Sequence, residues 1–224
     1  IEYVATHSAD IIGLQEFWHA SEQLVRLWEE YARTAGYVLH LCPRVDGKRD
    51  GNALLIRAAL CTATPRFEAF HYNDWGSRVV QSATVDLVGG QSIVVLQTHL
   101  TFPHSSAHDP VMRRHQGRKL AELSRTLTGA ACVFGDLNNP SEDDAALRCL
   151  TTLGGLRPMP PPRDEGDVIS HVAHTGALMS CDLALTRGPC RIGQWSLGAT
   201  REELVGRSLP SDHRPLHATI LLGA

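Results

Sequence analysis

Short apolar runs recur along the chain, and turn signals separate them. The runs are rich in Val, Ile, Leu and Thr, and this pattern predicts buried or half-buried strands. Asp46-Gly47 and Gly89-Gly90 are turn signals between such runs. The predicted strands lie near 10–16, 37–42, 52–58, 60–70, 79–87, 91–98, 131–134, 180–186, 190–198 and 214–222.

Helical spacing appears in three places. Leu24, Trp28, Tyr31 and Ala35 recur at helical intervals, and Gly36 follows as the expected C-cap. A second helix is predicted from Asp109, as N-cap with Pro110 next, to about Leu127. Ser141 is the predicted cap of a short helix that ends near Leu150. Residues 154–167 are rich in Gly and Pro, which predicts a surface loop.

Strands outnumber helices in this order of elements. The predicted fold class is therefore α+β, with two packed sheets forming a sandwich and helices on the outside. The chain has 224 residues and shows no internal repeat and no break in composition. A single domain over residues 1–224 is predicted.

Composition narrows the class of protein. Hydrophobic residues make up 43% and charged residues 20%, a balance that excludes a disordered chain. The net charge of −3 argues against a tight, nonspecific nucleic-acid binder. None of the six cysteines falls in a CxxC pair, so we expect free thiols and favour a cytoplasmic location. No apolar run is long enough to span a membrane.

Polar residues stand at the ends of several predicted strands, where apolar side chains would otherwise be expected. Alone, each has an ordinary explanation as a cap, a loop charge or a structural histidine. Asp182 is the exception, since it lies inside the apolar run Cys-Asp-Leu-Ala-Leu and a buried carboxylate needs a partner. The set comprises Glu16, His99, Asp136, Asn138, Asp182, Asp212 and His213.

Six of these positions belong to four short motifs in a familiar order: Gln-Glu at 15–16, Thr-His-Leu at 98–100, Gly-Asp-Leu-Asn at 135–138 and Ser-Asp-His at 211–213. In this order they resemble the endonuclease/exonuclease/phosphatase superfamily, whose fold is DNase I-like, with four α/β/β/α layers. The Gly51-Asn52-Ala-Leu-Leu strand and the Arg113-x-x-Gln116 helix also fit that pattern. The run Thr-His-Leu-Thr-Phe-Pro-His at 98–104 is similar to plant and protist members, some of which carry EF-hands. No EF-hand loop occurs here, so the sequence does not support calcium sensing.

The resemblance implies a role for each member of the set. It implies that Glu16 binds Mg²⁺, for which Mn²⁺ is a possible substitute, and that Asp212 lies on the metal side. It also implies that His99 stabilises the transition state or the leaving oxygen, and that Asp182 orients His213. His213 would contact the phosphate or the attacking water. Asp136 and Asn138 are two residues apart, and an extended backbone would turn both to one side, to orient water and to bind phosphate. The choice between Asp136 and the His213–Asp182 pair as general base stays open.

The chain departs from the superfamily pattern at its start. Members place a strand bearing an Asn before the Asp-Ile-Ile-Gly-Leu-Gln-Glu segment. Only nine residues precede Asp10 in this chain, the first is Ile rather than Met, and none is Asn. We therefore expect a domain truncated at its N-terminus.

Other signals have weaker functional interpretations. His171-Val-Ala-His174 could be half of a zinc site, but no third ligand stands at a useful spacing. Basic residues of the second helix form either a solvated face or a surface for an anionic substrate: Arg113, Arg114, Arg118, Lys119 and Arg125. Walker, Gly-x-Ser-x-Gly, dinucleotide and HExxH motifs are absent from the sequence.

The predicted function is a metal-dependent phosphoester hydrolase, either a phosphodiesterase or a phosphatase. A small-molecule or lipid-headgroup phosphoester is the favoured substrate, because the net charge is acidic. A nuclease acting on DNA or RNA is the alternative within the enzyme class. The alternative of another class is a catalytically dead binding module of the same fold, against which the complete set of polar residues argues.

Overall fold

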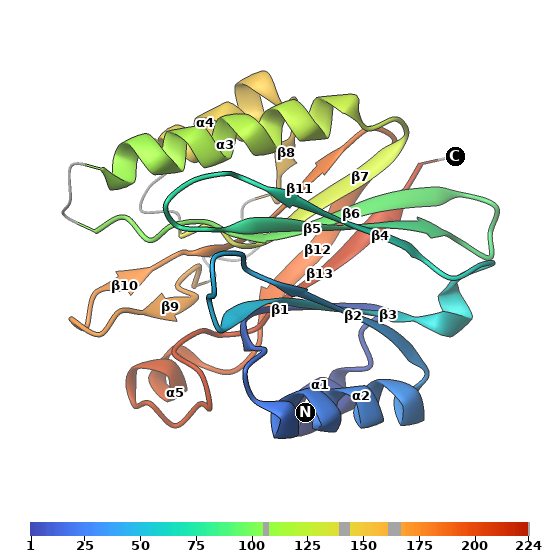
Figure 1. Cartoon of the computed structure of the whole chain (residues 1–224), viewed down its shortest axis with the longest axis horizontal. Coiled ribbons are helices and arrows are strands. Elements are labelled where there is room, and N and C mark those ends of the chain that lie inside the picture. The colour runs from blue at the N-terminus through green and yellow to red at the C-terminus, as the bar shows by residue number, and fades with distance from the viewer. Residues whose placement is uncertain (105–107, 139–143, 161–166, 224) are drawn as a thin grey trace. The chain divides into compact units, whose positions relative to one another are not determined.

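The computed structural model describes residues 1–104, 108–138, 144–160 and 167–223, and the chain divides into two compact units, Ile1–His99 and Leu100–Ala224. Each unit combines antiparallel strands with helices (Figure 1). The predicted α+β class of sheets with flanking helices is therefore confirmed. The prediction of one domain over residues 1–224 stays a prediction.

Unit 1 contains two antiparallel sheets. Their strand orders are β1-β3-β2 and β4-β5-β6. The elements are α1 (Glu2–His7), β1 (Ile11–Trp18), α2 (Glu22–Ala35), β2 (Tyr37–Pro43), β3 (Asp50–Arg57), η1 (Ala58–Leu60), β4 (Arg66–His71), β5 (Val79–Asp86) and β6 (Ser92–His99).

Helix α2 covers the outer face of the β1-β3-β2 sheet (Figure 1). It begins where the Ser21 hydroxyl accepts a hydrogen bond from the Leu24 N–H and ends at Gly36, whose φ of 75° is left-handed. Trp28 is buried against Phe17 of β1, with ring centroids 6.3 Å apart. The helix predicted from apolar spacing and a C-cap glycine is thus confirmed.

A buried amide joins the two sheets of unit 1. The Gln97 side chain donates to the carbonyl oxygens of Leu14 and Ala53, at 2.8 and 3.2 Å. Gln97 lies on β6 and its acceptors lie on β1 and β3, so the hydrogen bonds of its amide nitrogen cross the apolar interface, while its amide oxygen has no hydrogen-bond partner among the described residues. These hydrogen bonds fix how the two sheets of this unit face each other.

Unit 2 contains a sheet of order β7-β11-β8 and two smaller antiparallel pairs, β9 with β10 and β12 with β13. Helices α3 and α4 lie side by side in Figure 1. The elements are α3 (Asp109–Thr126), β7 (Ala130–Asp136), α4 (Ala145–Arg148), η2 (Cys149–Leu153), β8 (Arg157–Pro158), β9 (His171–Val172), β10 (Leu178–Met179), β11 (Asp182–Arg187), β12 (Cys190–Leu197), α5 (Arg201–Val205) and β13 (Leu216–Leu222).

Several predicted boundaries differ from the structure. The strand expected over 60–70 begins only at Arg66, because residues 58–60 form a 3₁₀ turn instead. His108, not Asp109, occupies the N-cap position of α3, and Asp109 lies in the first turn. Ser141 lies outside the described residues, and Asp144 caps α4 by accepting from the N–H groups of Ala146 and Leu147. Part of the predicted 154–167 loop is strand β8, which pairs with β11.

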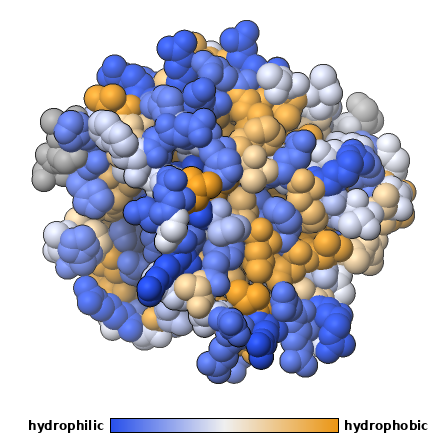
Figure 2. Space-filling view, in the orientation of Figure 1, coloured by the Kyte–Doolittle hydropathy of each residue, from blue (hydrophilic) through white to orange (hydrophobic). Residues whose placement is uncertain are grey.

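The surface mixes polar and apolar residues, as the face in Figure 2 shows. Trp75 is the most exposed of the large apolar side chains, at 78%. No helix among the described residues is both long enough and apolar enough to cross a membrane. All six cysteines are free thiols, as predicted.

Candidate active site

In unit 2, the His213 imidazole lies between two carboxylates. Its Nδ1 is 2.8 Å from Asp182 Oδ2, and its Nε2 is 3.7 Å from Asp136 Oδ2. Asp136 is the last residue of β7 and Asp182 the first of β11, and the two are direct partners in the antiparallel register. The sheet therefore places both carboxylates at one end, and the structure brings together three residues that the sequence predicted.

This arrangement changes the proton affinity of His213. Burial alone lowers the pKa of His213, but the hydrogen bond that the imidazolium donates to Asp182 and the charges of Asp182, Asp136 and Asp212 outweigh it and raise the pKa to about 9. The imidazole is therefore protonated at neutral pH, when both nitrogens are donors. A quarter of the side chain remains exposed, so a ligand can reach it.

Asp136 and Asn138 interact differently from the prediction. Asn138 has a φ of 48°, which is left-handed, so the extended backbone assumed from the two-residue spacing ends before it. Its side-chain nitrogen donates to the Leu100 carbonyl at 2.9 Å, and its backbone N–H donates to Asp136 Oδ1 at 2.8 Å. Asn138 therefore orients the Asp136 carboxylate through its main chain, which corrects the expected same-side projection.

A buried arginine on α3 ties together the segments around these residues. Arg113, 2% exposed, donates to the carbonyl oxygens of Thr101 and Leu137 and forms a two-point ion pair with Asp144. Gln116 adds two hydrogen bonds to the same segment, since its amide oxygen accepts from the Thr101 N–H and its amide nitrogen donates to the Thr101 hydroxyl. The Arg113-x-x-Gln116 pattern is thus an anchor for the chain beside Asn138.

This finding corrects the predicted basic face of the second helix. Arg113 is buried and committed to Asp144, while the other basic residues of α3 are exposed. Arg118 forms an exposed i,i+4 pair with Glu122. Those basic side chains are exposed to solvent.

Glu16 and His99 lie near each other in unit 1. The Glu16 Oε1 is 3.9 Å from Nδ1 of His99, whose side chain is 6% exposed, while the Glu16 side chain is 71% exposed. Glu16 has a φ of 52° and lies where the β1–β3 register shifts, so it belongs to a β-bulge. The bulge redirects this carboxylate out of the sheet, leaving it available to a ligand.

The structure adds one residue that sequence reasoning did not place in the site. His171 of β9 stacks on His213, with ring centroids 4.3 Å apart and planes inclined by 21°. Its Nε2 is 3.6 Å from Asp212, whose side chain is 68% exposed. Burial, followed by the charge of His213, lowers the pKa of His171. Nothing in the local spacing indicated this pairing.

His171 and His174, weighed as half of a zinc site and set aside because no third ligand follows, have different surroundings. His174 is exposed, and the residue that meets His171 is His213 rather than His174. His104 and His108 are exposed, and His104 pairs with Asp109 at 3.2 Å.

Two groups of side chains within the described ranges could hold a metal ion, and they share His213. They are His171, Asp212 and His213, and Asp136, Asp182 and His213, with ligand atoms within 4.8 Å of one another in each group. Mg²⁺ prefers oxygen ligands and keeps several waters. Exposed carboxylates such as Asp212 and Glu16 fit that preference, because solvent reaches them and their oxygens have room for a hydrated ion.

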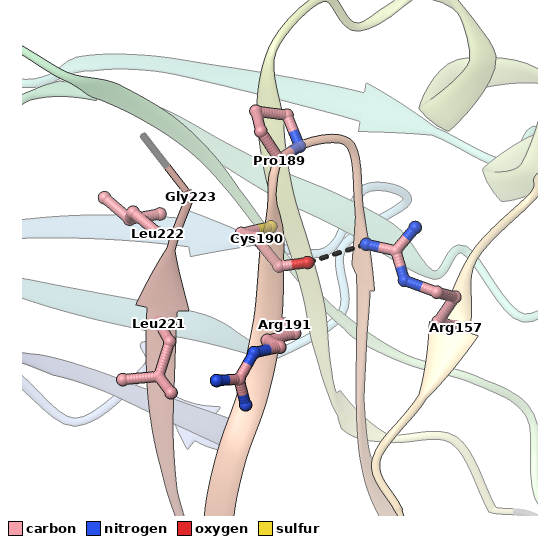
Figure 3. A pocket seen from close by; sticks show the side chains of 7 residues that line it. All are labelled: Arg157, Pro189, Cys190, Arg191, Leu221, Leu222 and Gly223. Carbon is pink, nitrogen blue, oxygen red and sulfur yellow. Dashed lines mark hydrogen bonds between the residues drawn. The ribbon is translucent and has the colours of Figure 1, made fainter.

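A pocket of about 380 Å³ lies elsewhere in unit 2 (Figure 3). Arg157 of β8 donates to the Cys190 carbonyl at its edge. The lining carries no carboxylate and none of the predicted site residues, so it lacks the groups for hydrolysis. It is lined by Arg157, Pro189, Cys190, Arg191, Leu221, Leu222 and Gly223.

Comparisons with known proteins relate this chain to others by sequence and by structure. An uncharacterized calcium-binding protein of Arabidopsis thaliana is 29% identical over 124 residues, which cover 51% of this chain but only a quarter of that relative. The endonuclease/exonuclease/phosphatase from Bacteroides vulgatus has a similar structure, with a TM-score of 0.78, 18% identity, and coverage of 99% of this chain and 88% of that one. The 2′,3′-cyclic phosphatase ANGEL2 gives a TM-score of 0.79 at 12% identity, with coverage of 100% and 85%.

These likenesses to solved structures establish the fold, and the family model establishes membership. The model of the endonuclease/exonuclease/phosphatase family matches residues 1–213, which include all seven predicted site residues. The chain belongs to the endonuclease/exonuclease/phosphatase family.

Proposed function

We propose that this chain is a Mg²⁺-dependent hydrolase of phosphoesters. The observation that carries the proposal is the imidazole of His213 held between the carboxylates of Asp182 and Asp136, in a chain of a family named for nucleases and phosphatases. A cationic, partly exposed imidazole suits an anionic substrate, and an adjacent carboxylate suits a water nucleophile.

The geometry supports Asp136 as the general base. With a pKa of about 9, His213 carries its proton at neutral pH and would donate a hydrogen bond to a phosphate oxygen rather than accept a proton from water. Asp136 would take the proton of a water that attacks phosphorus. The new bond joins the water oxygen to phosphorus, and the ester P–O bond breaks. Asp182 would keep His213 charged and oriented.

Magnesium would be held by exposed carboxylates. Asp212 in unit 2 and Glu16 in unit 1 are the residues we propose as ligands, both with more than half of the side chain exposed. When bound, the ion supplies positive charge that stabilises the charge developing on the phosphoryl oxygens. His99 is proposed as a donor that stabilises the transition state or the leaving oxygen.

A small phosphoester or a lipid headgroup is the proposed substrate class. The net charge of −3 and the solvated basic side of α3 supply no strong field for a polyanion. The 2′,3′-cyclic phosphatase with a similar fold was crystallised with a nucleotide vanadate, so small phosphoesters are compatible with this architecture.

The decisive experiment measures hydrolysis of bis(p-nitrophenyl) phosphate and p-nitrophenyl phosphate, with Mg²⁺, with Mn²⁺ and with EDTA. We expect turnover that requires the metal and falls by about 100-fold or more in Asp136→Ala and His213→Ala, because each removes a group that acts in the transition state. The ratio of the two substrates ranks diesterase against monoesterase.

The matched control is His174→Ala, which removes an exposed histidine from the same part of unit 2. It should leave turnover unchanged. Turnover that survives in both site variants, or that persists in EDTA, would contradict the proposal. Turnover restricted to DNA or RNA would replace the proposed substrate class with the nuclease alternative.

A further inference from the structure

The dipeptide Ser170–His171 touches both members of the Asp182–His213 pair. The buried hydroxyl oxygen of Ser170 accepts hydrogen bonds from the backbone N–H groups of Cys181 and Asp182, at 3.0 and 3.1 Å. His171, the next residue, stacks on the His213 ring. One short segment therefore contacts the backbone of Asp182 and the imidazole ring of His213.

The backbone pairing explains why the two rings meet. The Val172 N–H donates to the Asp212 carbonyl, and the Arg214 N–H donates to the Ser170 carbonyl, at 3.1 and 2.7 Å. His171 and His213 are thus opposed in a short antiparallel bridge. Side chains of opposed residues project to the same face, which places the imidazoles in contact.

The face of the His171 ring packs against the His213 ring. Its ring nitrogens have partners of their own, since Nδ1 forms a hydrogen bond of 3.6 Å with the Cys181 thiol and Nε2 lies 3.6 Å from Asp212 Oδ2. The stacked centroids are 4.3 Å apart, and Phe102 meets the His171 ring nearly perpendicularly at 6.2 Å. His171 is itself 6% exposed, so its orientation is fixed by packing.

We infer that His171 is a positioning residue, which holds the His213 imidazole in line with Asp182 through its flat ring. The expected effect on rate rests on the proposed function, whereas the stacking contact itself is observed in the structure. Without a flat neighbour, the His213 ring can rotate about its side-chain bonds, and the hydrogen bond to Asp182 loses its alignment. A small misplacement of a reacting group costs rate rather than substrate affinity.

The test compares His171→Phe with His171→Leu. Both replacements are apolar and lack ring nitrogens, but only phenylalanine keeps a flat ring that can stack. We expect kcat to fall by about tenfold or more in His171→Leu, with KM little changed, and to recover most of the wild-type value in His171→Phe. His174→Ala serves as the exposed control, and thermal melts verify that each variant is folded.

A second readout does not depend on activity. The hydrogen-bonded Nδ1 proton of His213 should give a downfield resonance in proton NMR, assigned by its loss in His213→Ala. We expect the resonance to persist in His171→Phe and to broaden or vanish in His171→Leu. An unchanged resonance in folded His171→Leu would overturn the inference, as would equal effects of the two replacements on kcat. If the wild type hydrolyses no phosphoester, the proposed function fails, while the resonance still decides the role of His171.

Discussion

At the scale of single residues, the charge of His213 depends on three acidic neighbours. Asp182 provides the hydrogen bond and the nearest negative charge, and Asp136 and Asp212 add to the field. His171 responds in the opposite direction, because burial and the charged His213 ring both lower its pKa. The pKa values of the two stacked histidines are therefore shifted in opposite directions. Contacts between segments distant in sequence produce this difference.

The raised pKa of His213 predicts a pH-dependent stability. The native state binds this proton more tightly than the unfolded state, so the contribution is fully present below pH 6.5 and is lost as pH rises towards 9. The shift corresponds to at most roughly 3 kcal/mol in the free energy of unfolding. Urea denaturation in EDTA at several pH values between 6.5 and 8.5 should show stability falling with pH, with a smaller fall in His213→Gln. Equal slopes in the two proteins would contradict the assignment.

At the scale of elements, α3 anchors the segments beside the site. Gly117 allows α3 to approach α4 closely, since a Cβ at that position would lie 2.5 Å from the Ala146 Cα. Arg113 then reaches the ends of two segments through their carbonyls, at Thr101 and Leu137. The Gly-Asp-Leu-Asn motif is therefore held by helix packing as well as by strand pairing.

Replacing Arg113 should destabilise the protein strongly. Arg113→Met removes both backbone contacts and leaves Asp144, only 9% exposed, without its counter-charge, so we expect a loss of about 3–5 kcal/mol in the free energy of unfolding. Arg118→Ala is the matched control on the same helix, where the ion pair with Glu122 is exposed and should contribute less than about 1 kcal/mol. Urea titrations of the three proteins measure the difference. Similar losses in the two variants would show that Arg113 is not the anchor.

At the scale of the whole molecule, charge bears on the choice of substrate. The chain carries 21 Lys and Arg residues against 24 Asp and Glu residues. Nonspecific affinity for nucleic acid comes mainly from neutralised phosphates, and a net acidic protein contributes few such contacts. The acidic net charge therefore supports the proposed small phosphoester substrate.

We therefore expect weak binding to a fluorescent DNA duplex. In EDTA, which prevents turnover, and at about 0.15 M salt, the dissociation constant should be weaker than about 100 µM by fluorescence anisotropy. An RNA oligomer of the same length should behave alike. A dissociation constant of about 1 µM or tighter for either would favour the nuclease alternative over the small-substrate proposal.

The sequence by itself determined the elements and the chemistry of the site residues. Apolar periodicity located β1, α2, β5, β6, β11 and β12 to within a few residues, because it reflects which face of each element is buried. The residues Asp136, Asp182 and His213 were identified from their unusual positions in or beside apolar runs and from the resemblance to a family, and the structure brings them together.

Only the tertiary structure decided how those residues interact. The left-handed turn at Asn138, the burial of Arg113 and the stacking of His171 on His213 all depend on segments distant in sequence. A spacing rule describes one element at a time, whereas these contacts arise where a bridge, a helix and a strand end converge. For that reason His171-Val-Ala-His174 resembled a local pair in the sequence, while the folded chain pairs His171 with a residue from another segment.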